Sequence, residues 1–192
     1  MNLEIMTKAK KSWLVAGIVL LALVLDQVSK VYIKTHFELG EAREVFSWFW
    51  IVFVENNGMA FGIEWFSKLL LTLFRIVAVG ILGWYVHTMI HKQQVRVGYL
   101  ATVAMVIAGA LGNIIDCVCY GEIWEYADWF HGKVVDMLYF PLIRNAAGEV
   151  LFFRPVFNVA DSFITVAVFL IILFYRKDLD DSLNQIFPKK DK

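Results

Sequence analysis

The chain carries no net charge and very little cysteine, and both shortages exclude functions. Its 18 basic residues balance its 18 acidic ones, so nothing in the overall charge attracts nucleic acid or an acidic partner. The two cysteines, Cys117 and Cys119, are separated by a single residue. That spacing is too short for a comfortable disulfide and differs from the two-residue spacing that is usual for zinc ligands. We therefore expect no nucleic-acid partner, no disulfide and no zinc site at this pair.

Histidine is also scarce, and its positions do not complete a metal site. His131 is the one histidine in the loop that follows the cysteines, and no fourth ligand is evident there. His87 and His91 are four residues apart, but Thr88 stands where a His-Glu-x-x-His site has its glutamate. The serines of the polar segments lack a histidine that could act as their base. We expect no metal, no cofactor and no serine nucleophile.

Hydrophobic residues dominate the chain. They make up 59% of its 192 residues, compared with about 45–50% in soluble domains. A bilayer-spanning helix needs about 20 mostly apolar residues. Four stretches meet this requirement, approximately residues 13–33, 69–90, 97–115 and 156–175. We predict an all-α membrane protein with four transmembrane helices, which forms a single integral membrane domain over residues 1–192.

The placement of lysine and arginine predicts the orientation of these spans. One side of the predicted bundle carries short basic clusters in all three of its segments, at Lys8, Lys10, Lys11, Lys92, Arg96, Arg176 and Lys177. Basic residues on the other side are spread through longer loops that are rich in acids. By the positive-inside rule both termini are cytoplasmic, and residues 178–192 form a flexible cytoplasmic tail. We reject a cleaved signal peptide, because no small-residue cleavage site follows the first apolar core.

The two outer connections have different compositions. Residues 44–55 are dense in aromatic and β-branched side chains and lead into Asn56-Asn57-Gly58, which is typical of a strand followed by a hairpin turn. We therefore predict a small β-sheet (a cradle) on the outer side, between the first two spans. The connection between the last two spans, residues 116–155, shows no clear periodicity. We expect an irregular outer loop there.

Two aspartates lie where a membrane protein can least easily hold them. Asp136 interrupts an apolar run, and Asp161 lies at the mouth of the last span. An ionisable side chain near hydrocarbon indicates function. Two carboxyls close together tend to share a proton, and one neutral plus one ionised acid is what water-mediated peptide hydrolysis requires. The alternative is that each caps a helix or pairs with a base such as Lys30 or Arg154.

Five polar segments interrupt the apolar pattern in a fixed order. They are Asp26-Gln27-Val28-Ser29-Lys30, Asn56-Asn57-Gly58-Met59-Ala60-Phe61-Gly62, Gly112-Asn113-Ile114-Ile115-Asp116, Val134-Val135-Asp136 and Phe157-Asn158-Val159-Ala160-Asp161-Ser162. This set resembles the bacterial lipoprotein signal peptidase family, also called signal peptidase II or prolipoprotein signal peptidase. The resemblance runs from the first span to the fourth.

The resemblance implies a membrane-embedded aspartic endopeptidase. Such an enzyme removes the signal peptide of diacylglyceryl-modified prolipoproteins by cutting before the lipid-modified cysteine. By the family pattern Asp136 and Asp161 are the catalytic pair. The positions implied to bind substrate or support the site are Asp26, Lys30, Asn56, Gly58, Gly112, Asn113, Asp116 and Asn158. Asp26 and Lys30 are also one helical turn apart, so they can pair with each other.

The resemblance also implies a setting and partners. The protein is expected in the bacterial cytoplasmic (inner) membrane as a multi-pass monomer, with its active site on the extracytoplasmic side. Its partners are then diacylglyceryl-prolipoprotein substrates and membrane lipids, and the family inhibitor globomycin is expected to bind the site. Two other functions stay open from the residues. One is an ion- or proton-coupled transporter, since intramembrane charges can line an ion path, and the other is a scaffold protein.

The chain departs from the family pattern at two places. Cys117 stands where the family usually has an arginine, and Lys133, Arg144 and Arg154 are candidates to replace it. The link from Asp116 to Asp136 is longer than is common, with residues 124–131 as the insertion. We predict that this insertion forms part of a lid over the site.

Overall fold

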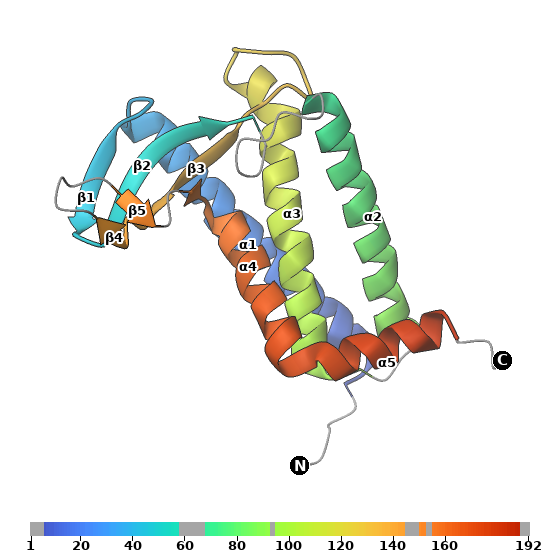
Figure 1. Ribbon diagram of the computed structural model, residues 1–192. Helices are drawn as coiled ribbons and strands as arrows, with labels where there is room; N and C mark the ends of the chain where they lie inside the picture. The colour runs from blue at the N-terminus through green and yellow to red at the C-terminus, as the bar shows by residue number, and fades with distance from the viewer. Residues whose placement is uncertain (1–5, 58–67, 93–94, 145–149, 153–154, 189–192) are drawn as a thin grey trace.

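Long helices form the body of the protein (Figure 1). The computed structural model describes residues 6–57, 68–92, 95–144, 150–152 and 155–188. The helices are α1 Lys8–His36, α2 Lys68–Lys92, α3 Val97–Ile123 and α4 Val159–Leu170, the last continued by a π-helical turn, η2 Ile171–Tyr175, and by α5 Arg176–Ile186. Within these residues, four helical stretches are long and apolar enough to cross a membrane. The prediction of four transmembrane helices is therefore confirmed.

Helix α3 is the central helix of the bundle. In its most apolar stretch 56% of the residues are buried, compared with 17% in α1, 17% in α2 and 11% in the span that begins with α4. Glycines on α3 allow its neighbours to approach closely. A Cβ atom at Gly109 would collide with the backbone of Ala160, and one at Gly112 would lie 2.5 Å from the Asp26 carboxylate. Small residues at helix contacts are typical of membrane bundles.

A four-stranded antiparallel sheet lies at one end of the bundle (Figure 1). Its strands, in spatial order, are β1 Ala42–Phe46, β2 Phe49–Asn56, β3 Val134–Tyr139 and β6 Val156–Phe157. The predicted extended run at 44–55 thus forms parts of two strands, because a turn at 47–48 divides it. The Asn-Gly turn that we expected next includes Gly58, which lies outside the described residues.

The sheet is not confined to the connection between the first two spans. The segment that we predicted to be irregular contributes β3, as well as a separate pair, β4 Ile143–Arg144 and β5 Val150–Phe152, while β6 comes from the first two residues of the predicted fourth span. Strand β3 lacks the alternation of apolar and polar residues because four consecutive residues, from Val134 to Met137, are buried. A strand covered on both faces has no period-two pattern, so its sequence does not reveal it.

A hydrophobic cluster joins the sheet to the bundle. It contains Ile33 and Phe37 from α1 and its end, Tyr120 from α3, Phe53 from β2, and Val135 and Met137 from β3. Val135 is fully buried, with 0% of its surface exposed. Packing on this cluster therefore fixes β2 and β3 against the ends of α1 and α3, where the polar segments of the sequence lie.

The opposite end of the bundle differs from the prediction. Residues from Asp178 to Ile186 belong to helix α5 instead of a flexible tail, and α5 turns across the end of the bundle near the N-terminus (Figure 1). Arg96 holds this turn, because its Nη2 donates to the Phe174 carbonyl at 2.9 Å and its Nε lies 3.0 Å from Asp178. A π-helical turn interrupts the regular backbone hydrogen bonds of the α-helix, and Arg96 supplies a donor to the Phe174 carbonyl.

Candidate active site

Asp136 is buried on β3 and accepts two amide hydrogen bonds. Only 2% of its surface is exposed. Its Oδ2 accepts from Asn56 Nδ2 at 3.1 Å, and its Oδ1 accepts from Asn158 Nδ2 at 2.7 Å. Asn56 reaches it from the neighbouring strand, since Val54 is the register partner of Asp136 and Asn56 lies two residues further along the same face. Neutral donors on both oxygens hold the carboxyl group in one orientation.

Asp161 lies in the first turn of α4 and is partly exposed. Asn158 is the N-cap residue, and the two form a reciprocal capping box in which Asp161 N donates to Asn158 Oδ1 at 2.9 Å. Asn113 on α3 donates its Nδ2 to Asp161 Oδ1 at 2.8 Å. The cap explains why the helix begins here, and it places the carboxylate at the positive end of the helix dipole.

The side chain of Asn158 joins the two aspartates. Its Nδ2 donates to Asp136, and its Oδ1 accepts from the backbone of Asp161. The same Nδ2 lies 3.1 Å from Asn113 Oδ1, so the two amides form one network across α3, β3 and α4. Burial, and then the negative charge of Asp161, raises the pKa of Asp136 to about 7. The structure therefore brings both predicted aspartates into one polar site.

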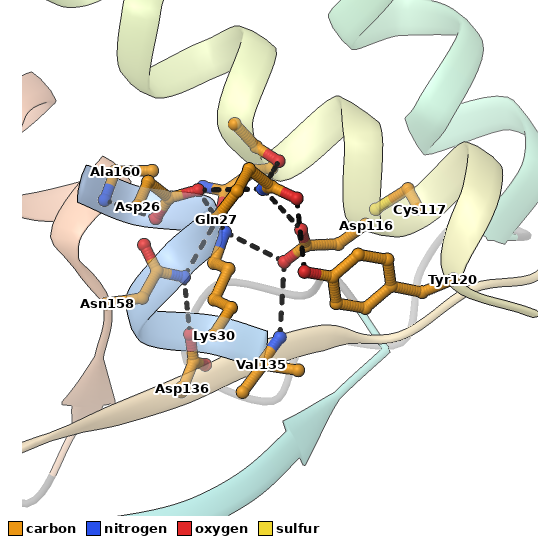
Figure 2. Close-up of polar contacts among 12 residues, drawn as sticks. Asp26, Gln27, Lys30, Asp116, Cys117, Tyr120, Val135, Asp136, Asn158 and Ala160 are labelled. Atoms are coloured by element: carbon orange, nitrogen blue, oxygen red, sulfur yellow. Dashed lines mark hydrogen bonds and ion pairs between the residues drawn. The ribbon is translucent and has the colours of Figure 1, made fainter. Parts of the chain in front are cut away.

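A buried ion cluster supports this network (Figure 2). Lys30 Nζ lies 2.8 Å from Asp26 Oδ2 and 2.8 Å from Asp116 Oδ2, and all three side chains are 0% exposed. The ammonium group also donates to Asn113 Oδ1 at 3.1 Å. The predicted pairing of Asp26 with Lys30 is therefore present, but it is one half of a larger cluster. Lys30 reaches the aspartate pair through the Asn113 amide.

Gln27 completes the cluster, although our sequence analysis did not single it out. Its Nε2 lies 3.0 Å from Asp26 Oδ2, 3.0 Å from Asp116 Oδ1 and 3.2 Å from the Gly112 carbonyl, and its Oε1 accepts from Tyr120 OH at 3.1 Å. Its place between Asp26 and Lys30 in a polar segment was the available signal. The sequence did not show that the Gln27 side chain points from α1 toward α3, because that depends on how the two helices pack.

Backbone donors attach this cluster to the elements that carry the aspartate pair. Asp26 Oδ1 accepts from Ala160 N, next to Asp161, at 2.9 Å, and Asp116 Oδ2 accepts from Val135 N, next to Asp136, at 3.3 Å. Each supporting aspartate thus holds the chain beside one member of the pair. Of the predicted supporting positions, the structure brings together Asp26, Lys30, Asn56, Gly112, Asn113, Asp116 and Asn158, while Gly58 lies outside the described residues.

Among the described residues, a cation that we did not propose contacts Cys117. Arg75 on α2 donates its Nη1 to Cys117 Sγ at 3.2 Å. Lys133 instead bonds Glu55 at 3.0 Å, and neither Arg154 nor the side chain of Arg144 belongs to the described part of the chain. Nothing in the sequence links positions 75 and 117, which become neighbours when α2 packs against α3.

The predicted insertion, residues 124–131, packs on the end of α3. Tyr126 N donates to the Gly121 carbonyl at 3.0 Å, and Phe130 N donates to the Val118 carbonyl at 2.9 Å. The bond to Gly121 gives a partner to a carbonyl that the helix end leaves without one. The lid function stays a prediction. Within the described ranges, no group of three or more His, Cys, Asp and Glu side chains is arranged to hold a metal ion.

Comparisons with known proteins agree on one family. A profile described as "Signal peptidase (SPase) II" matches residues 18–176. The lipoprotein signal peptidase of Porphyromonas gingivalis is 42% identical over 187 residues, which cover 85% of this chain and 83% of that protein. The enzyme of the same name from Streptococcus pneumoniae is 34% identical, covering 88% of this chain and 96% of that protein. A solved structure described as a bacterial membrane enzyme is 31% identical, with a TM-score of 0.64 and coverage of 93% and 92% of the two chains.

Proposed function

Because this chain belongs to the signal peptidase II family, we propose that it removes the signal peptides of prolipoproteins and that Asp136 and Asp161 perform the cleavage. Its relatives carry the name lipoprotein signal peptidase, and the chain covers most of their length. The substrate is then a diacylglyceryl-modified prolipoprotein, cut before its lipid-modified cysteine. The observation that carries the aspartic mechanism is the single Asn158 side chain that donates to the Asp136 carboxyl group and accepts from the backbone N–H of Asp161.

The two aspartates begin the reaction in different protonation states. Asp136 holds the proton, because burial and the neighbouring charge raise its pKa to about 7. Asp161 is the ionised partner, since it lies at the N-terminus of α4, where the helix dipole and the amide of Asn113 stabilise negative charge. Because Asp161 is partly exposed, water reaches the aspartate pair from the side of Asp161.

Hydrolysis then follows in two balanced steps. Asp161 takes a proton from water as the water oxygen attacks the scissile carbonyl carbon, and Asp136 donates its proton to the carbonyl oxygen. The product is a neutral tetrahedral diol. In the second step the carbon–nitrogen bond breaks, Asp161 passes its proton to the leaving nitrogen, and Asp136 recovers a proton from a diol hydroxyl. The pair returns to its starting state.

The supporting residues hold this geometry. Asn56, Asn113 and Asn158 donate to the two carboxylates, and the Lys30 cluster fixes the Asn113 amide with its oxygen toward the ammonium group. Positioning of this kind supplies a large part of the rate in well-organised sites.

The site belongs on the extracytoplasmic side of the membrane. It lies at the end of the bundle opposite α5 and the N-terminus (Figure 1). That opposite end carries Arg96, Arg176 and the lysines of the first turn of α1, which the positive-inside rule assigns to the cytoplasm. Both termini are then cytoplasmic. The transporter alternative gains no support, because the family and its named relatives are peptidases.

Cleavage of a synthetic diacylglyceryl prolipoprotein by purified protein tests the proposal. We expect wild type to cut the substrate, and Asp136→Asn and Asp161→Asn each to lower kcat by about 100- to 10,000-fold, because that is the size of general acid–base help per group. Chelators should change nothing. Asp128→Asn, in the insertion, is a matched control that should retain activity. Cleavage by either site variant at the wild-type rate would exclude the aspartic mechanism.

A further inference from the structure

Glu55, the residue before Asn56, is held by two lysines. Its Oε1 lies 2.6 Å from Lys34 Nζ on α1, and its Oε2 lies 3.0 Å from Lys133 Nζ, just before β3. The side chains of Lys34 and Glu55 are 7% and 12% exposed, while that of Lys133 is 37% exposed. This is a largely desolvated double ion pair, unlike the more exposed pair of Glu41 and Arg43 at the start of β1.

Aromatic rings surround the ammonium group of Lys34. Its Nζ lies 5.5 Å from the ring centre of Phe53, 5.2 Å from Trp124 and 5.1 Å from Tyr126. Each distance is within the range of a cation–π contact. Tyr126 also accepts a hydrogen bond from Lys133 N at 2.7 Å. Two of these three rings belong to the insertion 124–131, so the insertion forms one wall of the ion pair.

The geometry of β2 connects this ion pair to the aspartate site. Successive side chains of a strand point to opposite faces, so Glu55 and Asn56 point in opposite directions. Glu55 is the register partner of the buried Val135 and shares its face with Phe53, which packs in the cluster below the sheet. Asn56 points to the other face and donates to Asp136 at 3.1 Å. Holding Glu55 on one face therefore sets the direction of Asn56 on the other.

We propose that Glu55 is a positioning residue, which Lys34, Lys133 and the aromatic wall of the insertion hold so that Asn56 points at Asp136. This inference rests on the proposed function of Asp136. It gives the insertion a role separate from the predicted lid, because Trp124 and Tyr126 shield the ion pair from water. The ion pair outweighs the opposing effect of burial, so the pKa of Glu55 lies below its usual value and the side chain is ionised at neutral pH.

Steady-state cleavage of the synthetic prolipoprotein by Glu55→Gln, Asn56→Ala and the double variant tests this role. We expect Glu55→Gln to lower kcat by roughly 10- to 100-fold with KM within about twofold of wild type, since small misplacements near a reacting group have effects of this size. The double variant should be no slower than Asn56→Ala alone, because both changes remove the same contact. Glu41→Gln, in the exposed ion pair, is the matched control and should behave like wild type.

The pH profile separates positioning from simple support of the fold. Asn56 stabilises the ionised form of Asp136, so its loss moves the alkaline limb of kcat to higher pH. Glu55→Gln should move the limb in the same direction, whereas a residue that only supports the fold would lower the amount of folded enzyme and leave the limb in place. Should Glu55→Gln fail to fold, Lys133→Met, at the more exposed end of the pair, should show the same limb shift.

Three results would overturn the inference. The first is additive losses in the double variant, and the second is an unchanged pH limb in both Glu55→Gln and Lys133→Met. The third is a wild-type value of kcat for Glu55→Gln in a preparation where Asp136→Asn and Asp161→Asn are inactive. That last result refutes the positioning role and leaves the proposed function intact. If Asp136→Asn or Asp161→Asn stays active, the proposed function and this inference both fail.

Discussion

Two pairs of aspartates lie close together in this protein, and they differ in what surrounds their charge. Asp26 and Asp116 share the ammonium group of Lys30 at 2.8 Å each, whereas the described contacts of Asp136 and Asp161 are with amide groups. A carboxylate bonded to an ammonium group has its charge compensated. A carboxyl pair bonded to amides is oriented without a full counter-charge, so one member can keep a proton. The first pair is therefore suited to holding the bundle together, and the second to moving protons.

Removing the cation should have the largest effect on stability. Lys30→Met leaves Asp26 and Asp116 buried without a partner charge, and breaking a buried pair in this way is worth about 3–5 kcal/mol of unfolding free energy. We expect little folded protein in detergent, measured by thermal unfolding. Asp136→Asn, by contrast, should fold at least as well as wild type. Equal stability of Lys30→Met and wild type would contradict the structural role of this pair.

Loss of one amide should affect activity more than folding. Asn113→Ala removes the donor to Asp161 at 2.8 Å and the acceptor for Lys30. We expect kcat to fall roughly 10- to 100-fold, as for other losses of a positioning contact near a reacting group. Asn57→Ala, at an exposed neighbour of Asn56, is the control and should cleave at the wild-type rate. A lower melting temperature with nearly unchanged kcat would show that Asn113 mainly supports the fold, as Asp26 and Asp116 do.

The pH dependence of activity should come from the second pair. The pKa of Asp136 is raised to about 7, so the proton that it donates is lost as pH rises through that value, and kcat should fall there. The stability of the folded state should also fall as pH rises toward this value. A carboxyl whose pKa is raised on folding destabilises the folded state progressively as pH rises from its unfolded pKa to about 7. Asp136→Asn should therefore gain stability relative to wild type over this range. A flat kcat profile across neutral pH would argue against the assignment.

The smallest effect is expected at the end of the bundle that carries α5, far from both pairs. Arg96→Ala removes the donor to the Phe174 carbonyl and the ion pair with Asp178, whose arginine is about half exposed. A hydrogen bond and a partly exposed ion pair of this kind are worth about 1 kcal/mol. We expect a small drop in melting temperature and unchanged cleavage. A large loss of activity would show that α5 is coupled to the site across the membrane.

Local patterns in the chain were sufficient for the spans and for part of the site. Hydrophobic length identifies α1 to α4, because each span depends on its own residues and on the lipid around it. The pairing of Asp26 with Lys30 follows from one turn of helix. The ends of elements were less well predicted. Helix α3 continues to Ile123, beyond the predicted limit at residue 115, and carries Asp116 with it.

Contacts between distant segments could not be derived in the same way. Arg75 beside Cys117, Gln27 between two carboxylates, and Asn56 opposite Asp136 all join residues that are far apart in the chain. Strand β3 was missed because it is covered on both faces. Each of these features depends on how whole helices and strands are placed relative to one another. A short stretch of sequence carries no information about that placement.

The sequence by itself determined that this chain crosses the membrane four times and carries ionisable residues at the ends of its spans, since hydrophobic length and the free-energy cost of burying charge act on each segment separately. Only the tertiary structure decided which of those residues meet. Packing of α3 against α1 and α4, and of β3 against β2, assigns one aspartate pair to a lysine and the other to asparagines. The physical reason is that hydrogen bonds and ion pairs act over a few ångströms, so their partners are chosen by the fold.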